Sequence, residues 1–232
     1  MQNIVEKIKG FIDYFMSRKD KNTYGGPFNN QKIRQEIFKD LMTTINFVDI
    51  FETGTYNGNT TEYMHKTSLL PTITVEINAR RYAFAKARLL KYPGIKVCFG
   101  NSSKMLRKIC SNKRIKNKPV FIYLDAHRNG KLPLLEEIQI IFENLEKAVI
   151  MIDDFKVPGF PGYIYDTYKS GESLELKYFS ELTLEGIKYY FPSTDPKFET
   201  GKKRGSVVIA NNPFLIEKLS SIKKLQLYDL NN

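Results

Sequence analysis

The chain has 232 residues, of which 42% are hydrophobic and 13% aromatic, with a formal net charge of +11. This length and apolar content predict one folded domain, or two small ones, and exclude an intrinsically disordered chain. No apolar run forms a signal peptide or approaches the roughly 20 residues of a membrane span. We therefore expect a cytoplasmic protein with no membrane partner.

The two cysteines, Cys98 and Cys110, have no CxxC spacing, so they cannot form a zinc site alone and are interpreted as buried thiols. The densest basic run covers residues 107–118, with six basic residues and no acidic one. It lacks the interleaved aromatic residues of a base-stacking surface. We interpret it as a solvated loop, with a phosphate-binding patch as the alternative.

Residues 4–16 place apolar side chains at helical spacing, which predicts an amphipathic helix that packs on the domain. Glu6 and Asp13 interrupt any basic face of this helix, so membrane contact is the weaker interpretation. A turn-rich connector at 24–30 leads to a second predicted helix at 31–45. We assign the first 45 residues to an N-terminal helical extension and residues 46–232 to the main domain.

Strands and helices then alternate along the chain. The predicted strands cover residues 47–52, 72–76, 95–99, 120–124 and 148–152. The predicted helices between them cover residues 58–66, 79–90, 102–109 and 132–147, and we expect Ser102 to cap the third. Such alternation indicates a parallel sheet with right-handed crossovers.

After Phe155 the alternation stops, and a stretch rich in Gly, Pro and Tyr runs to about Gly171. Two more predicted strands, at 187–191 and 205–210, have a short connection that suits an antiparallel pair. The whole pattern predicts an α/β fold with a mostly parallel seven-stranded sheet, an antiparallel C-terminal pair and helices on both faces.

Every predicted parallel strand ends in polar or glycine residues. In chain order these ends are Glu52-Thr-Gly54, Glu76, Gly100-Asn-Ser-Ser103, Asp125-Ala-His127 and Asp153-Asp154. Because ligands of open parallel sheets bind beyond the carboxyl ends of the strands, this convergence predicts a ligand site at one edge.

The first strand end carries Gly54-Thr-Tyr-Asn-Gly58, whose glycines let a ligand approach the backbone. Glu76 follows at the distance expected of a carboxylate that binds ribose hydroxyls. Tyr56 stands where a dinucleotide-binding GxGxxG loop would have its middle glycine, so the loop departs from that motif.

The segment Glu52-Thr-Gly-Thr-Tyr-Asn-Gly-Asn-Thr60 resembles motif I of class I S-adenosylmethionine-dependent methyltransferases, in the form found in catechol- and caffeoyl-type O-methyltransferases. Residues 27–31, 124–127, 152–155 and 157–163 extend the similarity to a bacterial group related to macrocin-type sugar O-methyltransferases. The likeness covers residues 24–211 and implies a Rossmann-like fold. In that group a tryptophan commonly follows the Asp-Ala-His triplet, whereas this chain has Arg128.

This resemblance implies S-adenosylmethionine as the cofactor. The implied cofactor-binding residues are Glu52, Gly54, Tyr56 and Gly58 at the methionine end, Glu76 at the ribose, Asn101 and Ser102 by the adenine, and Asp125.

Asp125, Asp153 and Asp154 fall on adjacent strand ends, and such an oxygen cluster suits Mg²⁺ or another hard divalent cation. A bound cation would lower the pKa of an acceptor hydroxyl, with Asp125 and His127 as catalytic residues and His127 as the proton acceptor. Alternatively, the two adjacent aspartates cap turns or pair with Arg128, and His127 is structural.

The stretch that follows the fifth strand begins at the same edge. It is either a lid with Tyr163, Tyr165 and Asp166 as substrate contacts, or a packed structural loop. The leading function is metal-assisted O-methylation of a small hydroxylated molecule, such as a sugar or secondary metabolite. The alternatives are an RNA or DNA methyltransferase, which we do not expect, and a non-catalytic cofactor-binding protein. A homodimer is left open.

Overall fold

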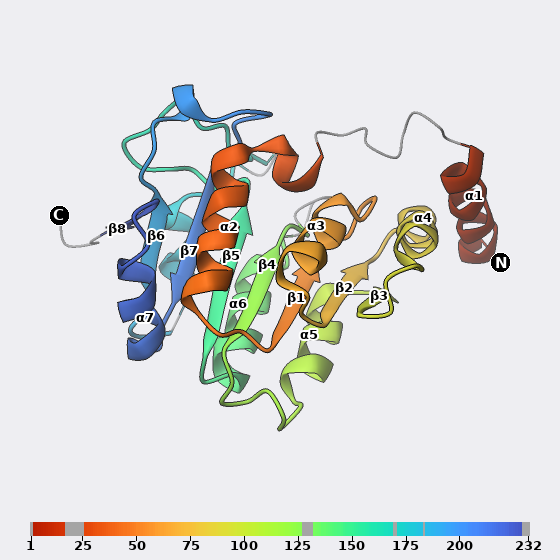
Figure 1. Ribbon diagram of the computed structural model, residues 1–232, viewed down its shortest axis with the longest axis horizontal. Coiled ribbons are helices and arrows are strands. Elements are labelled where there is room, and N and C mark those ends of the chain that lie inside the picture. Colours follow the sequence, from red (N-terminus) through yellow and green to blue (C-terminus); the bar gives the residue numbers. More distant parts are fainter. Residues whose placement is uncertain (1, 17–25, 127–131, 169–170, 183, 229–232) are drawn as a thin grey trace.

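One eight-stranded sheet runs through the computed structural model of the protein, in which residues 2–16, 26–126, 132–168, 171–182 and 184–228 are described (Figure 1). The strands in chain order are β1 (Asp49–Thr53), β2 (Thr72–Glu76), β3 (Ile95–Phe99), β4 (Val120–Leu124), β5 (Ala148–Asp153), β6 (Lys188–Pro192), β7 (Ser206–Ala210) and β8 (Leu225–Tyr228).

The strand order is β3-β2-β1-β4-β5-β7-β6-β8. The first five strands of the chain pair in parallel, whereas β7 pairs antiparallel with β5, and β6 pairs antiparallel with β7 and β8. The predicted fold class and the antiparallel pair are confirmed, and β8 adds one strand to the seven expected. The order reverses between β1 and β4, which is where ligands bind in such sheets.

The helices surround this sheet. They are α1 (Gln2–Met16), α2 (Lys32–Thr44), α3 (Asn59–Ser68), α4 (Ala79–Leu89), α5 (Ser102–Cys110), α6 (Leu134–Asn144) and α7 (Pro213–Ser220), with 3₁₀ turns η1 (Pro27–Asn30), η2 (Leu176–Glu181) and η3 (Pro196–Phe198). Among the described residues, no helix is long and apolar enough to cross a bilayer.

Two apolar clusters hold the layers together. Leu106 of α5 and Ile138 of α6 pack with one face of the sheet, and Phe38 of α2, Met64 of α3 and Leu215 of α7 pack with the other. Strands β4 and β5 are buried along their whole length, as central parallel strands with both faces covered should be. Helix α2 is buried along one face, with Ile37, Phe38 and Leu41 in the second cluster.

The predicted serine cap of α5 is wrong. The side chain of Asn101 accepts a hydrogen bond from the backbone N–H of Lys104 at 2.9 Å, so Asn101 is the N-cap and Ser102 is the first helical residue. Asparagine and serine are similarly good caps, and here the extended backbone of Asn101 decides between them.

Helix α1 packs on α4 at the β3 end of the sheet (Figure 1). Gly10 is buried there, and a Cβ atom at this position would collide with the backbone carbonyl of Arg80. Asp13 forms an ion pair with Arg80 at 2.6 Å, and the ring of Tyr14 meets Phe84 edge-on at 5.5 Å. Helix α1 therefore contacts the rest of the fold through α4.

The close approach at Gly10 generates a prediction. Gly10→Ala raises the intrinsic helix propensity of α1 by about 1 kcal/mol, but its methyl group cannot fit against Arg80. We expect α1 to separate from α4, so that amides of α1 exchange with deuterium at least about tenfold faster while the sheet stays protected. Asn3→Ala, at an exposed position of the same helix, is the control. Unchanged exchange in Gly10→Ala would contradict the contact.

Candidate functional site

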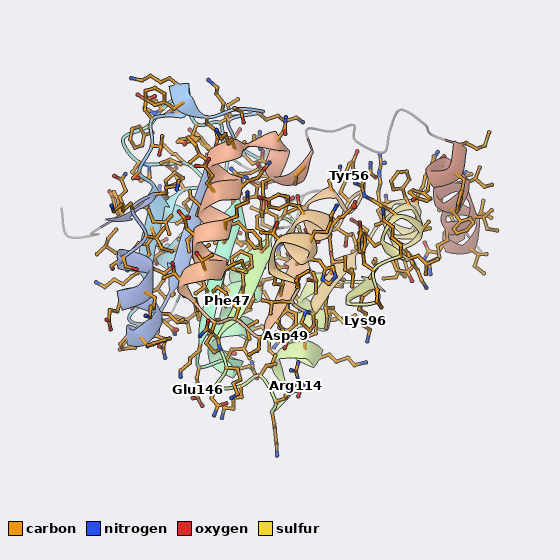
Figure 2. The ribbon with its side chains drawn as sticks, in the orientation of Figure 1. Phe47, Asp49, Tyr56, Lys96, Arg114 and Glu146 are labelled. Carbon is orange, nitrogen blue, oxygen red and sulfur yellow. The ribbon has the colours of Figure 1, made fainter. Side chains whose placement is uncertain are left out.

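The loop after β1 lies at the carboxyl edge of the sheet. Figure 2 shows Tyr56 of this loop at the opposite edge from Phe47, Asp49, Arg114 and Glu146. Arg114 belongs to the basic run at 107–118 and forms an ion pair with Asp49 at the start of β1. The described geometry therefore places the centre of the basic run away from the candidate ligand edge.

The loop depends on backbone conformations that few residues adopt. Gly54 and Gly58 have φ of +87° and +77°, and Tyr56 between them has φ of +48°. A side chain on Gly54 would also collide with the backbone carbonyl of Asp125. Gly54 thus allows the end of β4 to approach the loop, which places Asp125 beside it.

Glu76 fastens this loop to the end of β2. Its two carboxylate oxygens accept hydrogen bonds from the backbone N–H groups of Tyr56 and Asn78, each at 2.8 Å. Burial raises the pKa of Glu76, although these N–H donors act in the opposite direction. Because a carboxylate has about four acceptor positions, part of this capacity is left for a ligand hydroxyl.

Arg81 of α4 holds the loop from the other side, a contact that sequence reasoning missed. Its guanidinium lies 4.4 Å from the ring centroid of Tyr56 and donates to the side-chain oxygen of Asn57 at 3.1 Å. A basic residue in the first turn of a predicted helix gives no signal that it reaches back over the preceding strand. The contact stabilises a tyrosine in a left-handed conformation.

Glu52 supports the loop from the interior. Its carboxylate accepts hydrogen bonds from the hydroxyls of Thr61 and Thr74, the latter at 2.6 Å. Burial raises the pKa of Glu52 to about 7, and the two hydroxyls only partly offset this. The implied role of Glu52 at the methionine end of a cofactor stays a prediction.

A second buried acid, Glu137 of α6, lies on the opposite face of the sheet and was not anticipated. Thr53 donates to it at 3.4 Å, Ser102 lies beside it, and burial raises its pKa to about 7. Ser102 is itself buried beside Glu137, so its side chain would have to leave this position to contact an adenine, and the predicted contact stays a prediction. The sequence signal was an acid within the apolar stripe of the predicted helix.

One further residue at this edge is Ile77, which follows Glu76 and is 64% exposed. Its apolar side chain is therefore open to solvent beside the carboxylate of Glu76. Asn101, the other residue implied at the adenine, directs its side-chain oxygen to Lys104 as the cap of α5.

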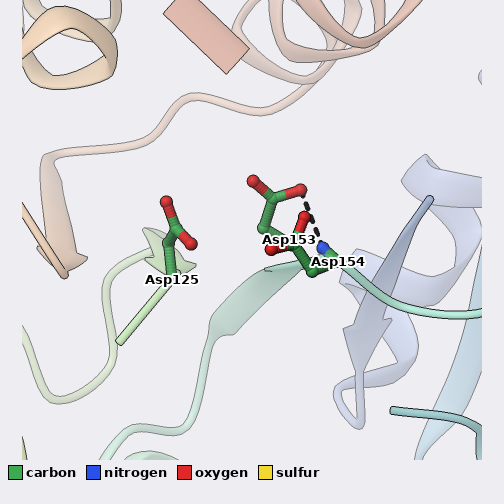
Figure 3. A group of neighbouring side chains, drawn as sticks. All are labelled: Asp125, Asp153 and Asp154. Atoms are coloured by element: carbon green, nitrogen blue, oxygen red, sulfur yellow. Dashed lines mark hydrogen bonds between the residues drawn. The ribbon is translucent and has the colours of Figure 1, made fainter. Parts of the chain in front are cut away.

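The three predicted aspartates do come together. Asp125 follows β4, and Asp153 and Asp154 stand at the end of β5 (Figure 3). One carboxylate oxygen from each lies within 4.8 Å of the others. The convergence of strand ends predicted from the sequence is therefore present at β4 and β5.

Asp153 is, however, fully engaged by the protein. One of its oxygens accepts from the guanidinium of Arg34 and from the backbone N–H of Asp154 at 2.8 Å. The other accepts from the hydroxyl of Tyr123 at 2.7 Å and the amide of Asn29 at 3.2 Å. These four donors fill the acceptor positions of one carboxylate.

Arg34 is a buried arginine that sequence reasoning missed. It comes from α2, is 1% exposed, and also donates to the backbone carbonyls of Arg204 and Gly205. Burial opposes the charge of Arg34, but Asp153 more than offsets this and the pKa lies above its usual range. The available signal was an arginine in register with the apolar stripe of Ile37, Phe38 and Leu41.

Asp154 has an arginine of its own. Arg204, just before β7, donates to Asp154 at 2.5 Å and also pairs with Asp166. Burial and the charge of Asp153 raise the pKa of Asp154 to about 6 despite Arg204. Each of the adjacent aspartates is thus paired with an arginine, Asp153 with Arg34 and Asp154 with Arg204.

The spacing of the three acids fits a divalent cation, but the donor set does not. A cation at this cluster would have to displace Arg34, Tyr123 or Asn29 from Asp153, and two arginines already balance the charge of the adjacent aspartates. We therefore derive no chemical step through a metal.

The segment after β5 is tied to its neighbours. Backbone N–H groups of Ile164 and Asp166 donate to Lys203 and Asp154 at 2.8 and 2.9 Å. Tyr163 is 2% exposed and its hydroxyl donates to the carbonyl of Thr194. The packed alternative fits this segment, and Tyr163 faces the interior and not a ligand. Tyr165 and Asp166 stay predictions as substrate contacts.

His127 and Arg128 lie outside the described residues. The other histidine, His65, hydrogen-bonds through Nδ1 to the carbonyl of Leu70 at 2.9 Å. The two cysteines are free and buried, as interpreted from the sequence.

A groove of about 670 Å³ lies elsewhere, on the outer side of α3. Its lining includes Pro27, Asn59, Tyr63, Lys66 and Arg88, and neither Glu76 nor Asp125 contributes to it. The groove is therefore separate from the strand ends that carry the candidate site.

No family model matches the chain, and no curated protein matches it in sequence. Solved structures do match its fold. A candidate caffeoyl-CoA O-methyltransferase from Staphylococcus aureus is 17% identical, with 78% of this chain and 84% of that chain covered and a TM-score of 0.57. An O-methyltransferase from Bacillus cereus in complex with SAH is 17% identical, with 90% of each chain covered and a TM-score of 0.55.

The O-methyltransferase TomG from Streptomyces achromogenes, involved in tomaymycin synthesis and solved with SAM, is 15% identical. The match covers 77% of this chain and 78% of that one, with a TM-score of 0.54. This chain therefore has the Rossmann-like fold of class I O-methyltransferases, as the strand order and the loop after β1 independently indicate.

The buried position of Glu52 generates a pH prediction. Its folded-state pKa of about 7 exceeds the usual value near 4.3, so the folded state binds the extra proton between these values and stability falls as pH rises through that window. Glu52→Gln keeps an acceptor for Thr61 and Thr74 but cannot ionise. At pH 8 we expect its free energy of unfolding to exceed that of the native chain by about 1–3 kcal/mol, so that it unfolds at a higher temperature. At pH 5 we expect the two chains to unfold at nearly the same temperature.

Glu143→Gln, at an exposed position, is the matched control and should show no such difference. Thermal unfolding without ligand measures both variants. An advantage of Glu52→Gln that is the same at pH 5 and pH 8 would show that ionisation is not its cause.

Proposed function

We propose that the protein is an S-adenosylmethionine-dependent methyltransferase that methylates a hydroxyl group of a small molecule. The observation that carries the proposal is the loop from Gly54 to Gly58, fastened by Glu76 where the strand order reverses. The fold shared with O-methyltransferases, two of them solved with SAM or SAH, supports it.

In this proposal the residues at the carboxyl edge bind different parts of the cofactor. Glu76 would accept hydrogen bonds from the ribose hydroxyls, and Ile77 would pack against the adenine. Gly54 and Gly58 keep the backbone of the loop open to the methionine end, beside Asp125. When bound, S-adenosylmethionine supplies a methyl group carried on a sulfonium.

The acceptor hydroxyl must lose its proton as the new O–CH₃ bond forms and the S–CH₃ bond breaks. The sequence assigns the proton to His127 and places Asp125 beside the reacting groups, and both assignments stay predictions. The paired aspartates and Arg204 form the polar wall next to Asp125 on which a hydroxylated acceptor, such as a sugar or secondary metabolite, could be held.

Metal assistance, expected from the sequence, is not part of the proposal because Asp153 has no acceptor position left. A nucleic-acid substrate is also disfavoured, since Arg114 of the basic run lies at the opposite edge from Tyr56 (Figure 2). A non-catalytic cofactor-binding protein would bind the cofactor without turnover, so a methyl-transfer assay with candidate acceptors separates it from an enzyme.

Cofactor binding provides the direct test. We expect SAH to raise the melting temperature of the native chain, because a ligand that binds only the folded state stabilises it. Glu76→Ala should weaken SAH binding at least about tenfold, since it removes a charged acceptor. Glu185→Ala, an exposed acid elsewhere, should bind SAH as the native chain does. Absence of any shift with SAH or S-adenosylmethionine would refute the function.

Binding of a divalent cation can be measured separately from cofactor binding. We expect Mg²⁺ at about 1 mM to leave the melting temperature unchanged, and EDTA to leave the affinity for SAH unchanged. Calorimetric titration of the protein with Mn²⁺ should likewise show no saturable binding. Saturable binding that Asp153→Asn removes, while Asp166→Asn keeps it, would restore the metal-assisted mechanism.

A further inference from the structure

Helix α1 has an apolar face that nothing in the described structure covers. This face lies opposite the side that packs on α4, where Gly10 and Tyr14 make their contacts. Its side chains are 46–78% exposed and recur at helical spacing: Ile4, Val5, Ile8, Phe11, Ile12, Phe15 and Met16. We call this set the α1 apolar face.

The acids of α1 do not interrupt this face. At 100° per residue, Glu6 and Asp13 fall on the other half of the helix. Glu6 pairs with Lys9 at 2.7 Å, and Asp13 pairs with Arg80 at 2.6 Å. The two acids therefore lie on the polar half of α1, and the α1 apolar face is uninterrupted.

The part of the protein on which α1 packs is strongly basic. Residues 77–96, which include α4 and the start of β3, contain six Lys or Arg residues and no Asp or Glu. Two of them, Arg80 and Arg88, form ion pairs with Asp13 and Glu62. This basic segment lies beside α1, because α1 packs on α4.

We propose that the α1 apolar face binds the surface of a membrane rich in anionic lipids. In this arrangement the helix lies in the plane of the interface, with its bulky apolar side chains among the acyl chains and the basic segment facing the head groups. Helix α1 stands at one end of the molecule, beyond α4, where a flat surface can reach it (Figure 1).

Two other occupants fit less well. A second copy of the chain could cover the apolar face, but pairing through α1 would bring two basic segments together, and like charges repel within the Debye length of about 8 Å. A nucleic acid would match the basic segment but would leave the apolar side chains in water. An anionic lipid surface complements both features, and it does so whether or not the protein is a methyltransferase.

The chain contains no tryptophan, which allows a clean spectroscopic test. Phe15→Trp places the only indole on the α1 apolar face, and Phe198→Trp, at a 66% exposed position elsewhere, is the matched control. With vesicles of phosphatidylcholine and about 30% phosphatidylserine, we expect a blue shift and quenching by brominated acyl chains for Phe15→Trp only.

Vesicle flotation of the native chain provides the second measurement. We expect at least about tenfold more bound protein on anionic vesicles than on phosphatidylcholine alone, and weaker binding as salt increases. Phe11→Ser combined with Phe15→Ser should abolish the binding, whereas Phe198→Ser should not. Circular dichroism of the double variant shows whether α1 stays helical.

Two results would overturn the proposal directly. In the first, the emission of Phe15→Trp is neither shifted nor quenched when anionic vesicles are added. In the second, the native chain binds neutral and anionic vesicles equally. A chain that is dimeric in solution, becomes monomeric on the double substitution and does not bind vesicles would identify a second copy as the occupant. Tight RNA binding without vesicle binding would assign the basic segment to nucleic acid.

Discussion

The buried ion pair between Arg34 and Asp153 is the interaction on which the rest of the site depends. It joins α2 to the end of β5, and through Gly205 it also reaches the start of β7. Removing one partner of a buried pair typically costs about 3–5 kcal/mol, because the other charge stays unpaired in the interior. This pair therefore fixes the parallel half of the sheet, the antiparallel strands and α2 in one arrangement at the carboxyl edge.

That arrangement divides the edge into two parts. On the β1 and β2 side, the loop with Gly54 and Tyr56 is shaped by backbone conformation and held by Glu76 and Arg81. On the β4 and β5 side, acids are paired with arginines from distant segments. The first part suits a nucleoside-like ligand approached through the backbone, and the second offers charge-balanced polar groups to an acceptor.

The sequence predicted the fold class and the strand ends well, because hydrophobic runs and glycine positions are local signals. The alternation of apolar strands with helices placed Glu76, Asp125 and Asp153 correctly at one edge. It failed where the answer depends on long-range partners. The pairing of Asp153 with Arg34 joins residues 119 positions apart, and no spacing rule could select Arg34 as the partner.

The same limit explains the misassigned cap of α5 and the missed strand β8. Asn101 and Ser102 are both good caps, and only the backbone conformation selects one of them. Strand β8 has four residues, Leu225–Tyr228, which is too short for a periodic pattern to rise above its surroundings. It forms because β6 offers an open edge to pair with.

Strand β8 also has a consequence for the behaviour of the protein at high concentration. Without it, β6 would end the sheet and present the aromatic run Tyr189-Tyr-Phe191 as an unpaired edge, a template for intermolecular strand pairing. The four residues of β8 replace that edge with a shorter one, and at the other end of the sheet Lys96 places a charge on β3. By pairing with β6, strand β8 therefore covers an edge that would otherwise favour intermolecular strand pairing and aggregation.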